Sequence, residues 1–135
     1  VLVIDSIVND NKVGVEVKDN SESLIGHTVF YNNKKPVKAY AKNWRYGSGG
    51  NVRLDKTLLR GPANILETDK FSKINITDST FVSGCPKTNS RLSLGPKVDC
   101  QLVTETKNSN LDIYLEEAVK SWGRRPTAIR RGAPN

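Results

Sequence analysis

The chain lacks several of the residues on which catalytic and metal sites depend. Its 135 residues include one histidine, two cysteines and no methionine. A zinc site would have to recruit carboxylates in place of Cys and His, so we expect no metal. Gly47-Ser48-Gly49-Gly50 lacks the Gly-Lys-Ser/Thr ending of a phosphate-binding loop, and no G-x-G-x-x-G motif follows a strand, so we expect no cofactor. There is also no nucleophile-elbow sequence.

Long apolar runs are also absent. No stretch approaches the ~20 apolar residues of a membrane-spanning helix, and the length suits a single domain. The chain starts at Val1 and has no Met, so we expect either a matured product or a segment of a longer protein.

The two cysteines predict a disulfide. Cys85 and Cys100 bracket a segment that contains Pro86, Gly95 and Pro96, which is typical of a closed loop. The bond would stabilise the fold by about 3 kcal/mol and would indicate an extracellular or periplasmic (cell-envelope) protein. The alternative is a pair of free buried thiols in a cytosolic protein.

Most of the chain has the pattern of short β-strands. Lys12–Lys18 alternates apolar and polar residues, and the turn residues 9–11 separate it from an apolar run at 2–8, which predicts a first hairpin. Residues 28–31 and 36–44 predict a second hairpin around the turn 32–35. Further strands are expected at 73–77, 80–82, 91–94 and 98–104.

One helix is predicted at 110–122, where apolar residues recur at helical spacing, with Ser109 as its cap and Gly123 as its stop. Its apolar stripe is expected to pack on the sheet, the alternative being a partner-binding face. The predicted fold is therefore α+β: a mainly antiparallel sandwich or partly open barrel of five to eight short strands with one C-terminal helix. We expect one β-rich domain over 1–123 and an extended or disordered basic tail over 124–135.

Acidic residues are scarce in two segments. Residues 27–60 hold eight Lys/Arg and one acid, and residues 124–135 hold four Arg and no acid. The leading hypothesis is a secreted or envelope-associated domain that binds an anionic partner through residues 34–60 and the tail. The partner would be a nucleic acid, a sulfated or acidic polysaccharide, or an acidic protein surface. The predicted anion-binding residues are Lys34, Lys35, Lys38, Tyr40, Lys42, Trp44, Arg45, Arg53, Arg124, Arg125, Arg130 and Arg131.

The strand at 36–44 supports this hypothesis. A period of two places Lys38, Tyr40, Lys42 and Trp44 on one face, where cations alternate with aromatic rings. Such a face suits an anionic polymer that also stacks on the rings. The simpler alternative is that the rings cover the core while lysine stems extend over them.

Two other functions remain open. A small metal-independent ribonuclease or toxin would use His27, a carboxylate such as Glu16 or Glu67, and cations among Lys38, Arg45 and Arg53 to stabilise the phosphate. A structural subunit of a surface assembly would pair its N-terminal strand, residues 1–8, with the sheet edge of a neighbour.

Overall fold

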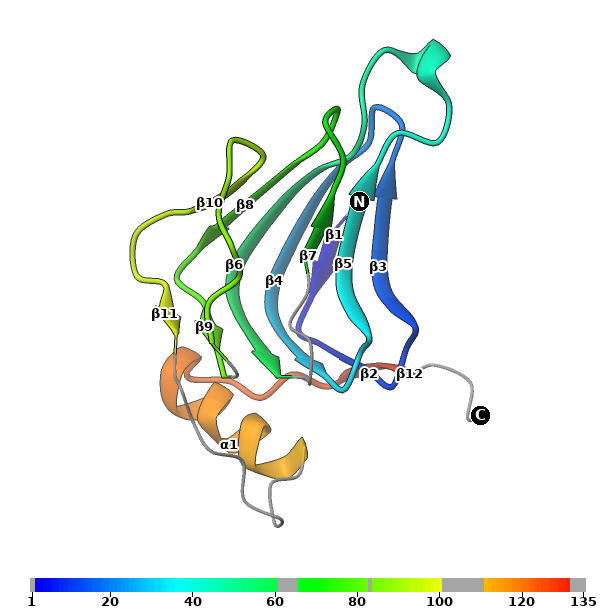
Figure 1. The fold of residues 1–135 in the computed structure, drawn as a ribbon. Helices are drawn as coiled ribbons and strands as arrows, with labels where there is room; N and C mark the ends of the chain where they lie inside the picture. Colours follow the sequence, from blue (N-terminus) through cyan, green and yellow to red (C-terminus); the bar gives the residue numbers. More distant parts are fainter. Residues whose placement is uncertain (1, 61–65, 83, 101–110, 132–135) are drawn as a thin grey trace.

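The computed structural model describes residues 2–60, 66–82, 84–100 and 111–131 (Figure 1). The strands are β1 (Leu2–Ile4), β2 (Ser6–Asn9), β3 (Val13–Lys18), β4 (Glu22–Tyr31), β5 (Lys35–Tyr40), β6 (Asn51–Arg60), β7 (Leu66–Thr68), β8 (Lys73–Thr77), β9 (Thr80–Phe81), β10 (Leu92–Leu94), β11 (Asp99–Cys100) and β12 (Ala128–Arg131). A short 3-10 helix, η1, covers Trp44–Tyr46, and α1 covers Leu111–Trp122.

The prediction of a mainly antiparallel sheet is wrong. Every strand pairing among the described residues is parallel, in a nine-stranded sheet and a separate sheet of β3, β5 and β7. The chain winds in coils, and each strand pairs with the strand that occupies the same place in the next coil. This is the arrangement of a parallel β-solenoid. Its parallel strands and one small helix give an α/β-like arrangement in place of the predicted antiparallel sandwich.

Both predicted hairpins are wrong for one physical reason. Asp10 and Asn32 have left-handed backbones, with φ of 59° and 56°, and each lies at a corner where the chain turns into the next sheet instead of reversing. The Asp10 amide donates to the Tyr31 carbonyl of the neighbouring coil (3.1 Å). Turn-forming residues therefore mark corners here, and β2 and β3 lie in different sheets.

The coils repeat at 22 residues where they are regular. Leu2 pairs with Leu24, and Asn51 pairs with Lys73, each a shift of 22 residues. Between β4 and β6 the shift is 29, because the segment between β5 and β6 is longer, and Ile74 pairs with Leu92 after only 18.

A bend within the larger sheet divides that sheet into two walls. The first wall consists of β1, residues 22–26 and 51–55, β8 and β10; the second wall consists of β12, β2, residues 28–31 and 57–60, β9 and β11. The sheet of β3, β5 and β7 is the third wall. The residues at the bend all have positive φ, and they are Asp5, His27, Lys56, Asp78 and Lys97.

Each bend is followed by a buried hydroxyl in the first four coils. These side chains are at most 2% exposed, and they are Ser6, Thr28, Thr57 and Ser79. The Thr28 hydroxyl donates to the Gly26 carbonyl (2.8 Å), and the Thr57 hydroxyl donates to Ser79 Oγ (2.8 Å). The column therefore satisfies polar groups that the bend would otherwise bury without partners.

The core lies inside the walls as columns of apolar residues. One column on the second wall runs through Val8, Phe30, Leu59 and Phe81, which are all 0% exposed. The column ends at the partly buried Cys100, whose disulfide to Cys85 confirms the predicted bridge.

The predicted helix is confirmed, and it packs outside the solenoid (Figure 1). Tyr114, Leu115 and Ala118 of α1 cover an outward column on the second wall formed by Ile7, Val29 and Leu58. Arg60 lies over the rings of Tyr31 and Tyr114, at 4.8 and 5.7 Å. The predicted cap Ser109 and the strand at 101–104 lie outside the described residues.

An asparagine ladder joins the first two coils at the corner between the second and third walls. Asn33, which is 1% exposed, donates from Nδ2 to the Val8 carbonyl (2.8 Å). Its Oδ1 accepts from the Asn11 amide (3.1 Å) and from Asn11 Nδ2 (2.9 Å). One side chain therefore satisfies three groups of the preceding coil.

We expect Asn33→Ala to lower the free energy of unfolding by about 2–3 kcal/mol, because it leaves the buried Val8 carbonyl and the part-buried Asn11 amide without this partner. Urea denaturation at pH 7 measures the change. The matched control is Asn51→Ala, at an exposed position on β6, which should change stability by less than about 0.5 kcal/mol. Equal effects of the two substitutions would contradict a structural role for the ladder.

Candidate binding surface on the third wall

The alternation predicted for the strand at 36–44 is confirmed as far as Tyr40, where β5 ends. Val37 and Ala39 are 0% exposed and face the core. Lys38 and Tyr40 lie on the outer face, with Lys38 Nζ 4.6 Å from the centre of the Tyr40 ring. The third wall therefore displays a cation and an aromatic ring in contact.

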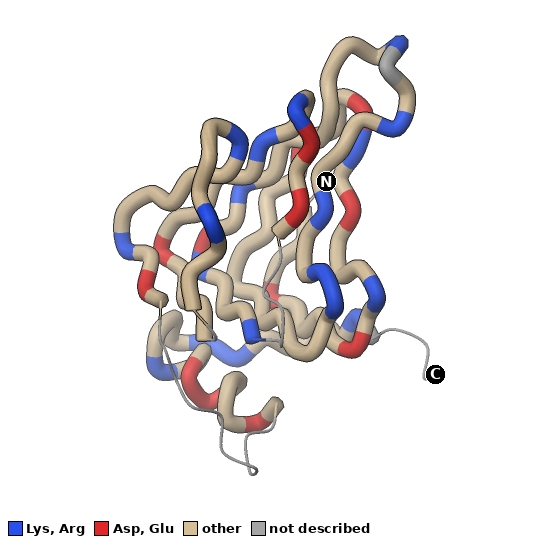
Figure 2. The backbone as a smooth tube through the Cα atoms, viewed as in Figure 1, with Lys and Arg blue, Asp and Glu red and all other residues tan. Residues whose placement is uncertain are grey.

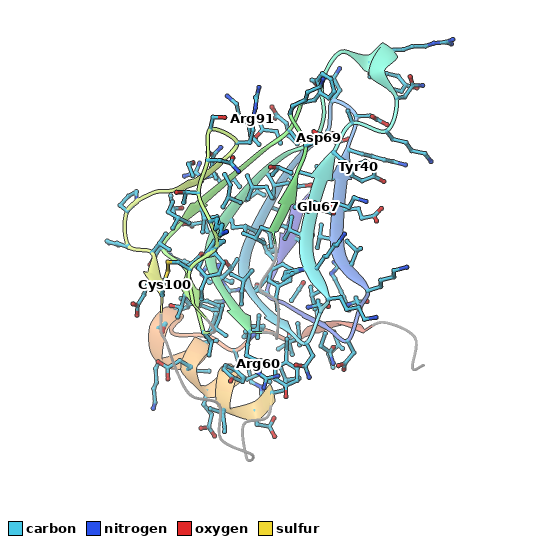
Figure 3. All side chains as sticks on the ribbon, viewed as in Figure 1. Tyr40, Arg60, Glu67, Asp69, Arg91 and Cys100 are labelled. Atoms are coloured by element: carbon cyan, nitrogen blue, oxygen red, sulfur yellow. A yellow bond between two sulfur atoms is a disulfide. The ribbon has the colours of Figure 1, made fainter. Side chains whose placement is uncertain are left out.

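Carboxylates from both neighbouring strands flank this pair. Glu16, Lys38 and Glu67 occupy the same register position on β3, β5 and β7. Glu67 accepts from Lys35 Nζ at 3.1 Å and lies 4.0 Å from Lys38 Nζ. Figure 3 shows Tyr40, Glu67 and Asp69 along the upper part of this wall, whereas Arg60, which ends β6 on the second wall, lies near α1.

The Tyr40 hydroxyl is held as a proton donor. It donates to Glu16 Oε2 at 3.3 Å. Loss of water around the ring, and then the charge and hydrogen bond of Glu16, raise the pKa of Tyr40 above its usual value. Tyr40 is therefore a neutral aromatic side chain at any physiological pH.

Residues 41–50 form an excursion that leaves the solenoid after β5 (Figure 1). They account for the longer shift between β4 and β6. Asp19 Oδ1 accepts from the backbone amides of Lys42 and Asn43, at 2.7 and 2.9 Å. At the other end, Gly49 donates its amide to the Phe71 carbonyl (3.0 Å).

Asp69 fixes the base of the excursion. Its carboxylate accepts from the amides of Ala41 (2.7 Å) and Phe71 (3.0 Å) and from the Ser72 hydroxyl (2.7 Å). Partial burial opposes ionisation, but these hydrogen bonds outweigh it and hold the pKa of Asp69 below its usual value.

The excursion and the adjoining turn display cations and aromatic rings. Tyr46 and Phe71 are 59% and 48% exposed, and Lys70 Nζ lies 5.1 Å from the centre of the Phe71 ring. Figure 2 shows Lys and Arg positions on the projecting segment. We call the following set the third-wall surface: Lys38, Tyr40, Lys42, Arg45, Tyr46, Lys70 and Phe71.

Lys35 also lies on the third wall, at the start of β5, where it pairs with Glu67. Of the other predicted anion-binding residues, Lys34 precedes β5 at the corner, and Arg53 is exposed on the first wall. Arg124 pairs with Asp5 at 2.7 Å, and Arg125 lies 3.7 Å from Asp112.

The tail predicted over 124–135 includes β12, which pairs with β2. Arg130 Nε lies 3.4 Å from Ser6 Oγ. The side chains of Trp44 and Arg131 lie outside the described part of the structure, as do residues 132–135.

His27 is a bend residue. Its φ is 47°, and its ring meets Trp122 of α1 edge-on, with 6.1 Å between centroids. Within the described residues its ring has no hydrogen bond or ion pair.

Sequence reasoning named Glu16 and Glu67 only as candidate ribonuclease carboxylates and did not place them beside Lys38, and it missed the pair Lys70 and Phe71. The available signal was the coil spacing, because Glu16 lies 22 residues before Lys38.

In the described ranges no group of three or more His, Cys, Asp or Glu side chains is placed to hold a metal ion. The same ranges contain no helix with the length and apolar character needed to cross a membrane. Searches against protein-family models, curated proteins and solved structures find no match to the chain.

We expect Asp69→Asn to destabilise the protein at pH 7 and to have a smaller effect in acid. The lowered pKa of the carboxyl means that its ionised form stabilises the fold above pH 3.8, and that this contribution is lost as the pH falls through the folded-state pKa. Urea denaturation of both proteins between pH 7 and pH 2 measures the difference. A difference in stability that does not change with pH would show that the charge of Asp69 is not what holds the excursion.

Proposed function

We propose that the third-wall surface binds an acidic polysaccharide chain. The observation that carries the proposal is the grouping of cations with exposed aromatic rings on one wall and on the excursion anchored to it. Cations contact carboxylate or sulfate groups, and rings pack on the apolar faces of sugars.

The solenoid geometry suits an extended polymer. Neighbouring parallel strands lie about 4.8 Å apart, so outward side chains at one register position form a row with that spacing. This spacing is comparable to the length of a pyranose residue in an extended chain. Insertions in repeat structures also map to loops on one face, often the binding face, and the excursion extends beyond the third wall.

The carboxylates on the wall favour a polysaccharide over a nucleic acid. Glu16 and Glu67 are adjacent to Lys38 in register. A nucleic acid and a polysaccharide with a charge on every sugar are both repelled by these carboxylates, but sugars also offer free hydroxyl groups, whereas a nucleotide within a strand offers a 2′-hydroxyl at most. Sugars offer hydroxyl groups between their charges, and carboxylates accept hydrogen bonds from hydroxyls. The disulfide also agrees with an extracellular location, where acidic polysaccharides are found.

The test measures affinity for polygalacturonate and heparin across a salt series. The variant Lys38→Gln/Lys42→Gln/Lys70→Gln removes three charges from the third-wall surface. The control Lys87→Gln/Lys97→Gln/Lys120→Gln removes three exposed charges from other parts of the molecule. We expect the first variant to lose at least about tenfold in affinity at low salt, equivalent to about 1.4 kcal/mol, and the control to lose much less.

A second variant separates stacking from charge. Tyr46→Ser/Phe71→Ser keeps the net charge, and we expect it to weaken binding even at high salt, where ionic contacts are screened. Equal losses in both lysine variants would reduce the interaction to net charge and contradict a defined site. Tighter binding of single-stranded RNA than of either polysaccharide at the same salt would assign the surface to nucleic acid, and degradation of that RNA would direct attention to His27.

A further inference from the structure

The N-terminal end of the solenoid forms a step, because the second wall extends one strand beyond the first and third walls. β12 pairs with β2 and extends the second wall by one strand. Among the described residues, β1 and β3 have no partner on that side, because β1 pairs only with β4 and β3 only with β5. The predicted pairing of residues 1–8 with a neighbour is therefore restricted to β1, since the edge of β2 is occupied.

Both edges of the step present unused peptide groups. The Asp5 amide donates to Gly26 of β4 (3.2 Å), so by alternation the peptide groups of Leu2 and Ile4 face the open edge of β1. The Ala128 amide donates to the Asp5 carbonyl (3.0 Å), so the peptide groups of Ile129 face the open edge of β12.

The same residues expose large aliphatic side chains. Leu2 and Ile4 of β1 are 58% and 45% exposed, and Ile129 of β12 is 63% exposed. Leu24, beside Leu2 on β4, is 41% exposed and continues the patch. Exposed aliphatic residues on unpaired strands favour pairing with another chain, and monomers usually protect such edges with charge or Pro.

We propose that two copies of this chain associate through a two-fold axis near the bend at Asp5, with β12 of each copy pairing antiparallel with β1 of the other. The step is self-complementary. On the second wall each copy has one additional strand, β12, and this strand fits beside the open edge of β1 on the first wall of the other copy. Such an interface is isologous and closed. Ile129 would then lie beside the partner's Leu2 and Ile4, as cross-strand neighbours do.

Charge is compatible with this geometry. Residues 1–21, which form the first coil, have a net charge of −2, and residues 118–135, which include β12, have a net charge of +5. β1 carries no charged side chain, so the arginines of β12 meet no cation on the partner's β1, and the self-complementary step favours a second copy as the occupant. This surface is distinct from the third-wall surface, so the two proposals stand independently.

Analytical ultracentrifugation of the 135-residue chain over a concentration series tests the association. We expect a monomer–dimer equilibrium that Leu2→Lys/Ile4→Lys weakens at least about tenfold, because lysines at an edge prevent strand addition. The control is Val119→Lys, at a helix position that is 42% exposed. Circular dichroism checks that each variant is folded.

Cysteine cross-linking tests the pairing itself, since both native cysteines are bridged. We mix two separately purified single variants, Ile4→Cys carrying an affinity tag and Ile129→Cys without one, so that the mixed disulfide has a mass of its own. Hydrogen-bonded antiparallel neighbours have Cα atoms about 5.5 Å apart, within the range of a disulfide. We expect a mixed disulfide at a yield well above that of Ile4→Cys mixed with Val119→Cys. A chain that remains monomeric at every concentration, a dimer that Leu2→Lys/Ile4→Lys leaves unchanged, or equal cross-linking in the two mixtures would overturn the proposal.

Discussion

Parallel hydrogen bonding between successive coils is the constraint on which the rest of the structure depends. Because each strand pairs with its counterpart in the next coil, equivalent positions share one environment along the whole stack. Val8, Phe30 and Leu59 differ in shape, yet all must be apolar because they occupy the same interior column. The constraint also sets polar positions: a hydroxyl follows the bend in the first four coils, and an asparagine recurs at the corner of the first two.

Short-range features were predictable because they depend on neighbours in the sequence. The α1 helix follows from the spacing of its apolar residues, the disulfide from the presence of only two cysteines, and the outward placement of Lys38 and Tyr40 from the alternation in β5. The direction of strand pairing was not predictable in this way. Asn and Asp at residues 9–11 suit a hairpin and a solenoid corner equally well, since both require a left-handed backbone.

The 22-residue repeat that would have distinguished a solenoid from a hairpin is weak in this chain. Residues 5–11 and 27–33 share a hydroxyl after the bend and an asparagine at the end, 22 residues apart. The excursion at 41–50 then lengthens the next spacing to 29, and a later coil shortens it to 18. A search for a fixed period therefore loses the pattern after two coils, although the structure preserves it.

The same winding explains why a cluster of charge in the sequence is not a patch on the surface. Lys38, Arg53 and Arg60 all belong to the basic segment 27–60, but they lie on the third, first and second walls. Arg60 is used to hold α1 through its contacts with Tyr31 and Tyr114, and it contributes nothing to a common binding face. Residues a coil apart are the true neighbours of Lys38, and they are the carboxylates Glu16 and Glu67. The electrostatic character of each wall is therefore set by spacing along the chain, and the combination of lysine, carboxylate and aromatic side chains on one wall is the basis for proposing a ligand that carries both charges and hydroxyl groups.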